Sequence, residues 1–260
     1  MQRSQIFSLL IFTGLFLLLY FGCDTKSKSH KLEEKSRVGN FELVSIERLM
    51  REARPELDPS AKAAISELEQ QLKLSDSDSA KVKAVKRLSS AWYNSGQPLI
   101  AGHYADEAAK LEDSPEAWSM SGTTYALAAK AVTDPTEKQH AVSKSREALE
   151  KALSMAPENM DAKINLALTY VEAPPKDEPM KGVMMLLGLN REAPENTSVL
   201  MQLARLGMQT GQYDKAVARL EKVIELRPTF GAAYCQLALA YKELQQAEKA
   251  QLALEKCDIK

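Results

Sequence analysis

The sequence is poor in residues that interrupt helices and in those that build sheets or disulfide frameworks. Its 260 residues include 11 Gly, 11 Pro and 6% aromatic side chains, whereas Ala, Leu, Glu and Lys are abundant. This composition favours helix over strand. The three cysteines, Cys23, Cys235 and Cys257, are too few and too scattered for a disulfide framework or a zinc site. We expect Cys235 and Cys257 to lie on opposite sides of one helix pair and not to be joined.

A basic excess and catalytic motifs are also missing. The 34 basic and 35 acidic residues nearly cancel, which argues against a broad nucleic-acid surface. The sequence contains no P-loop, no GxSxG turn and no GxGxxG loop. We expect the helical histidines, His103 and His140, to be solvated, because no Cys, Asp or Glu set stands at ligand spacing around them. The sequence therefore predicts a protein that is not an enzyme and has no metal and no cofactor.

The N-terminal segment is the one long hydrophobic run. Residues 6–21, IFSLLIFTGLFLLLYF, are almost uninterruptedly apolar and are followed by Gly22 and Cys23. Such a run predicts a signal or a membrane anchor over residues 1–23, with the membrane as a partner through residues 6–22. The end of the run resembles the cleavage box of bacterial lipoproteins, which implies lipidation of Cys23. Tyr20 and Phe21 depart from that box, so an uncleaved anchor remains the alternative.

The side of the membrane on which the remaining chain lies is not determined by the apolar segment alone. A lipoprotein would place the remaining chain outside the cytoplasm, on the periplasmic side of a bacterium, and this is the localisation that we predict. The basic residues between Lys26 and Arg37 leave open a cytoplasmic-facing, uncleaved anchor. The polar stretch 24–40 has no apolar period and predicts a flexible spacer.

The helical pattern begins at Phe41. Two leading helices are expected in residues 41–79, the second with Asp58 as N-cap and Pro59 at its first position. Farther along, a period appears: Leu203-Ala204 returns 34 residues later as Leu237-Ala238. Ala216 and Leu220 likewise return 34 residues later, as Ala250 and Leu254. Pro228 ends the helix that carries Ala216 and Leu220.

This period and its residue types resemble the tetratricopeptide repeat. The resemblance covers residues 80–260, in copies at about 82–114, 115–159, 160–196, 197–230 and 231–260. The copy at 115–159 carries extra residues between Tyr125 and Ser145, with Asp134 as a cap, so we expect both of its helices to be lengthened. The resemblance implies an all-α fold: a right-handed solenoid of antiparallel helix pairs, preceded by an N-terminal apolar anchor helix.

The family resemblance also implies a function. In such solenoids the first helix of each pair lines a concave face, which binds protein or peptide segments. The chain is thus predicted to be a membrane-tethered scaffold for a protein partner. Two alternatives remain open. The first is a periplasmic assembly factor that supports cytochrome maturation or outer-membrane assembly. The second is a module that self-associates into a homo-oligomer through the last helix, where Leu252 lies. Projecting the repeat pattern gives these concave-face residues: Lys86, Ser90, Tyr93, Met120, Thr123, Ile164, Asn165, Leu168, Met201, Gln202, Arg205, Gln236 and Leu239.

One subtype of the family clamps a C-terminal carboxylate with side chains at five polar positions. Lys86 fits the first of them, but Ser90, Met120, Asp161 and Asn165 do not match the other four. The sequence therefore does not support that clamp. Arg205 is the cation expected at the centre of the concave face, and burying an unpaired charge is costly. Either a ligand carboxylate meets Arg205, or a neighbouring glutamate pairs with it.

Overall fold

A computed structural model describes residues 44–257 of the chain. The chain divides into two units, Met1–Ser45 and Ile46–Lys260, and all the described helices belong to the second. The described residues form helices and no strands: α3 (Ile46–Glu56), α4 (Pro59–Lys73), α5 (Asp78–Asn94), α6 (Pro98–Glu112), α7 (Pro115–Ala131), α8 (Pro135–Met155), α9 (Met160–Glu172), α10 (Lys181–Glu192), α11 (Thr197–Gln209), α12 (Tyr213–Leu226), α13 (Gly231–Glu243) and α14 (Ala247–Leu254). The predicted all-α class is confirmed.

Short side chains cap the starts of several helices. The Asp58 carboxylate accepts hydrogen bonds from the backbone N–H of Ser60 and Ala61, and Pro59 follows as the first helical residue. Asp134 caps α8 in the same way. Asn159 and Asn196 occupy the equivalent places before α9 and α11. Each cap satisfies N–H groups that lack a partner in the first turn, as the sequence predicts for Asp58 and Asp134.

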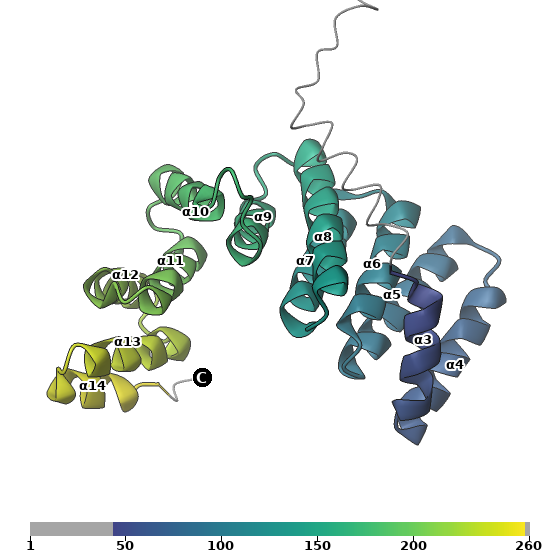
Figure 1. The fold of residues 1–260 in the computed structure, drawn as a ribbon, viewed down its shortest axis with the longest axis horizontal. Helices are drawn as coiled ribbons and strands as arrows, with labels where there is room; N and C mark the ends of the chain where they lie inside the picture. The colour runs from purple at the N-terminus through teal and green to yellow at the C-terminus, as the bar shows by residue number, and fades with distance from the viewer. Residues whose placement is uncertain (1–43, 258–260) are drawn as a thin grey trace, which may run out of the picture. The chain divides into compact units, whose positions relative to one another are not determined.

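Consecutive helices pack side by side as pairs, α5 with α6 through α13 with α14 (Figure 1). Small residues allow the close approach within a pair: Ala204 and Ala216 are both fully buried between α11 and α12. In the lengthened pair, Gly122 of α7 packs against Leu149 of α8. The apolar contacts form separate clusters along the chain, one in α3–α6 and another in α11–α14. The predicted solenoid of helix pairs is confirmed.

The lengthened pair is present as the sequence predicts. Helix α7 has 17 residues and α8 has 21, whereas α11 and α12 have 13 and 14. The additional turns of α8 carry His140, which is only 7% exposed and packs its ring edge-on against Tyr125 with 6.2 Å between ring centroids. The expectation of a solvated His140 is therefore wrong, because the extra turns pack against α7 instead of projecting into solvent.

The expectation that Cys235 and Cys257 stay apart is also wrong. The two residues form a disulfide, with 4.6 Å between their Cα atoms. The repeat pattern places Cys257 on a continuing helix, but α14 ends at Leu254. Turn hydrogen bonds then fold the chain back, including one from the backbone N–H of Cys257 to the carbonyl of Leu254. This turn brings Cys257 beside α13.

The prediction of a membrane-anchored, extracytoplasmic protein is overturned. Within residues 44–257, no helix is both long enough and apolar enough to cross a bilayer. The apolar segment 6–22, Cys23 with its predicted lipidation, and the spacer 24–40 all lie outside the described residues. A membrane partner has no support from the described helices.

Candidate partner-binding surface

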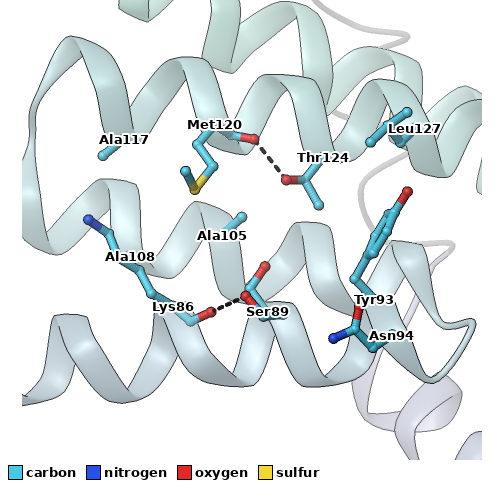
Figure 2. Close-up of a pocket in the computed structure, with 11 residues that line it drawn as sticks. Lys86, Ser89, Tyr93, Asn94, Ala105, Ala108, Ala117, Met120, Thr124 and Leu127 are labelled. Carbon is cyan, nitrogen blue, oxygen red and sulfur yellow. Dashed lines mark hydrogen bonds between the residues drawn. The ribbon is translucent and has the colours of Figure 1, made fainter. Parts of the chain in front are cut away.

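A groove of about 350 Å³ opens between α5, α6 and α7 (Figure 2). Three alanines, Ala105, Ala108 and Ala117, lie between the longer side chains that border the groove, and their small size leaves the space open. The longer residues that line it come from α5 and α7: Lys86, Ser89, Ser90, Tyr93, Asn94, Met120, Thr124 and Leu127. Lys86, Ser90, Tyr93 and Met120 are among the residues that the repeat pattern places on the binding face.

Apolar surface dominates what this groove offers to a partner. Met120 is 58% exposed, Tyr93 44% and Leu127 40%. The hydroxyl groups nearby already donate to the backbone. Ser90 donates to the carbonyl of Lys86, and Thr124 donates to that of Met120 (Figure 2). An exposed apolar patch beside satisfied polar groups is suited to an apolar side chain of a partner.

The charge at the groove is partly neutralised within the chain. Lys86, which lines the groove, forms a salt bridge with Glu112 of α6. A second, more open hollow beside the groove, toward Leu68 of α4, shares Lys86 and Ser90 with it and adds Lys83 and Arg87. The exposed side of α5 therefore joins apolar groove residues to basic ones.

Helices α7 and α9 use part of the predicted binding face for their own contacts. The side-chain amide of Asn165 donates to the hydroxyl of Thr123 at 2.9 Å, which links α9 to α7. Ile164 is only 4% exposed and belongs to a core cluster, and Leu168 packs against the same cluster. Ile164 is thus a core residue and not a surface for a partner, because α10 and α11 also contribute to that cluster.

Helices α11 and α13 place the remaining predicted residues near one another. Leu239 is 57% exposed, and Met201 packs partly against the C-terminal core. Three polar atoms here are buried without a hydrogen-bond partner among the described residues: Gln202 Oε1, Arg205 Nε and Gln236 Oε1. No salt bridge joins Arg205 to a carboxylate in residues 44–257, so the alternative of a neighbouring glutamate finds no support there.

Lys130 is a residue of this surface that the sequence analysis missed. It follows Leu127 by three positions on α7, so it continues the face that lines the groove. Burial lowers the pKa of Lys130, and the nearby charge of Arg205 lowers it further, while Glu172 opposes both effects. Glu172 is itself held by Lys138 at 2.6 Å. The helical spacing from Met120 and Leu127 was the signal that could have identified Lys130.

Side chains that could bind a metal ion or act in catalysis are few among the described helices. Residues 44–257 contain no group of three or more His, Cys, Asp or Glu side chains that could hold a metal ion. His103 pairs with Glu107 one turn away on α6, at 3.4 Å between Nε2 and Oε1. This pair lies within α6, and neither His103 nor Glu107 lines the groove.

The comparisons with known proteins agree with the repeat assignment. Residues 205–245 match a family model described as the TPR, or tetratricopeptide, repeat. The resemblance of the chain to this family is confirmed. No curated protein sequence matches the chain.

Solved structures of one protein, MamA, are similar in arrangement at low sequence identity. A structure titled "Crystal structure of MamA" has a TM-score of 0.44 and 18% identity, covering 65% of this chain and 92% of its own. "MamA RS-1 ArsTM double mutant" gives 0.45 and 16%, covering 68% and 92%. "Crystal structure of MamA protein" gives 0.43 and 18%, covering 68% and 89%. Similarity at this level does not extend to a shared partner or assembly.

Proposed function

We propose that this tetratricopeptide-repeat chain is a scaffold that binds a protein partner and is not an enzyme. The observation that carries the proposal is the groove between α5 and α7, with Tyr93, Met120 and Leu127 exposed along it. An apolar side chain of the partner would enter the groove and remove this surface from water. Helices α9–α13 would extend the contact, through the exposed and partly exposed residues Asn165, Leu168, Met201, Gln202, Arg205, Gln236 and Leu239.

A matched pair of substitutions tests the groove. Met120 in α7 and Met184 in α10 are similarly exposed, at 58% and 54%, but only Met120 lines the groove. We expect Met120→Glu to weaken partner binding by about 10- to 100-fold, because anchor residues of an interface contribute ~1–3 kcal/mol or more. Met184→Glu should leave binding unchanged. The measurement is capture of proteins from source-cell extract on the immobilised full chain, followed by mass spectrometry and a binding titration of the captured protein.

The reverse pattern would contradict the proposal. If Met184→Glu abolishes capture and Met120→Glu does not, the binding surface lies on α10 and not in the groove. Circular dichroism of both variants checks that each remains helical, which is expected because both side chains are more than half exposed.

Self-association is a second candidate, and the last helix favours it. Leu252 is 62% exposed and Leu254 54%, and both belong to the final described pair. Exposed leucines on a terminal repeat can bind a second copy, because no further repeat covers them within the described residues. Light scattering of the full chain over a range of concentrations tests this. We expect Leu252→Gln to remove any association. Leu74→Gln is the control, because Leu74, at the C-terminal end of α4, is similarly exposed at 69%.

A further inference from the structure

Three unpartnered polar atoms lie on two helices that pack against each other. Gln202 and Arg205 are three residues apart on α11, so they share one face of that helix. Gln236 stands 34 residues after Gln202, at the same place in the next repeat on α13, and α11 and α13 are in contact. Among the described residues, the two glutamine oxygens are hydrogen-bond acceptors without a donor, and Arg205 Nε is a donor without an acceptor.

An extended peptide has the complementary groups. Its backbone N–H groups are donors at regular spacing, and an acidic side chain supplies the acceptor that a guanidinium binds best. Two glutamines at equivalent positions of neighbouring repeats could receive two such N–H groups. Buried polar groups left without partners are costly, and three of the seven such atoms among the described residues lie on α11 and α13, where a bound segment would supply their missing hydrogen bonds.

Arg205 lacks an anionic partner among the described residues. No salt bridge joins its guanidinium to a carboxylate in residues 44–257, and its buried Nε has no acceptor there. A guanidinium in this state attracts an anion. The positive charge of Arg205 also acts on Lys130 of α7, whose pKa it lowers together with burial, while Glu172 opposes both effects.

We propose that Arg205 forms a subsite for an acidic side chain of the partner, whose backbone N–H groups are bound by Gln202 and Gln236. This inference rests on the proposed scaffold function and specifies the partner: an extended segment with an apolar anchor for the groove and an Asp or Glu for this subsite. The recognition differs from a clamp for a chain-terminal carboxylate, since an internal acidic residue suffices.

The test uses a displayed library of random dodecapeptides selected on the immobilised full chain. We expect peptides enriched in Asp or Glu, and selection on Arg205→Gln is expected to lose that enrichment. In fluorescence anisotropy, Arg205→Gln should weaken binding of a selected peptide by about tenfold or more. The same peptide with its acidic residues replaced by amides should bind both proteins equally. Lys222→Gln on α12, where Lys222 pairs only with Glu225 among the described residues, should bind like the unmodified chain.

A stability measurement separates recognition from a structural role. Arg205→Gln should leave Tm unchanged, because Arg205 forms no salt bridge in residues 44–257 whose loss would destabilise the fold. A clear fall in Tm with Arg205→Gln would assign Arg205 to the fold and overturn the inference.

The outcomes also distinguish this inference from the function on which it rests. Selected peptides that bind the groove, lose affinity with Met120→Glu and show no acidic preference would overturn the subsite alone. An acidic preference that survives Arg205→Gln would do the same. If the library yields no peptide that binds the chain, the scaffold function fails and the subsite fails with it.

Discussion

At the scale of single residues, two glycines of α10 have opposite surroundings. A Cβ atom on Gly182 would lie 2.5 Å from both the carbonyl oxygen of Ala167 and the backbone nitrogen of Val171. A Cβ atom on Gly188 would meet nothing within 4 Å. Gly182 is therefore required for the close approach of α9 and α10, whereas Gly188 has room for a side chain.

We expect Gly182→Ala and Gly188→Ala to change stability in opposite directions. Gly182→Ala should lower the free energy of unfolding by about 1–3 kcal/mol, because backbone atoms of α9 must move. Gly188→Ala should raise it by ~0.5–1 kcal/mol through helix propensity. Urea unfolding followed by circular dichroism measures both. Equal effects of the two substitutions would show that α9 and α10 are not packed as described.

His140 gives a pH dependence whose direction can be derived. Burial lowers its pKa below the ordinary value of 6.5, and Lys144 and His103 lower it further, whereas Asp106 and Glu147 raise it. The folded protein therefore keeps His140 neutral at a pH where the unfolded chain binds a proton. Stability is complete above the unfolded value and decreases as the pH falls below 6.5.

The corresponding prediction is a fall in Tm between pH 7 and pH 5 that His140→Gln reduces. His103→Gln, a change at a more exposed histidine of α6, should retain most of the fall. Differential scanning calorimetry at several pH values measures both profiles. A profile for His140→Gln that coincides with that of the unmodified chain would mean that carboxylates alone set the pH dependence.

At the scale of elements, the disulfide joins the end of the chain to the penultimate helix. Cys257 follows α14 and Cys235 lies in α13, so the bond closes a loop with a sequence separation of 22 residues. Helix α14 has only 8 residues and one buried side chain, Ala253. So short a helix depends on tertiary contacts, and the disulfide limits its separation from α13.

Reduction should therefore loosen α14 before any other described helix. With dithiothreitol or in Cys257→Ser, we expect faster hydrogen exchange in residues 247–254 and a loss of about 2–4 kcal/mol for unfolding this last pair. Exchange in α5–α8 should stay the same, because these helices do not contact the bond. Mass spectrometry of peptic fragments gives both values, and unchanged exchange in α14 would contradict the proposed role of the disulfide.

Helix positions could be predicted from the sequence wherever the signal is local. The caps Asp58 and Asp134 and the lengthened α8 follow from neighbouring residues, because a cap bonds only two or three positions away. Cys257 and His140 could not be placed in this way. Their surroundings depend on where a helix ends and on which other helix covers it, and a repeat pattern assumes that both are regular.

At the scale of the whole molecule, the sequence predicts which helices line the surface but not what each side chain contacts there. Lys86, Tyr93 and Met120 line the groove, and their role in binding a partner stays a prediction. Ile164 occupies an equivalent repeat position yet is buried, since its neighbours α10 and α11 cover it. Lys130 escaped prediction because a charge that lowers its pKa belongs to Arg205, 75 residues away in the sequence.

The separate apolar clusters determine how the molecule should unfold. One cluster joins α3–α6 around Leu88 and Trp92, and another joins α11–α14 around Leu220 and Val223. Contacts run mainly between neighbouring helices, so the stability of each end depends mostly on its own cluster. Leu88 and Leu220 are both fully buried and make a matched pair for substitution.

We expect Leu220→Ala and Leu88→Ala to open opposite ends of the helix array. Each substitution should cost about 2–5 kcal/mol of local stability, because it removes buried methyl groups and leaves a cavity. Leu220→Ala should accelerate hydrogen exchange in α11–α14, and Leu88→Ala should do so in α3–α6, each with little effect at the other end. Uniform acceleration by either variant would mean that residues 46–257 unfold as one cooperative unit.

With independent ends, a partner bound through both the groove on α5–α7 and Arg205 on α11 would link the stability of the two clusters. Peptide binding should then slow exchange at both ends together.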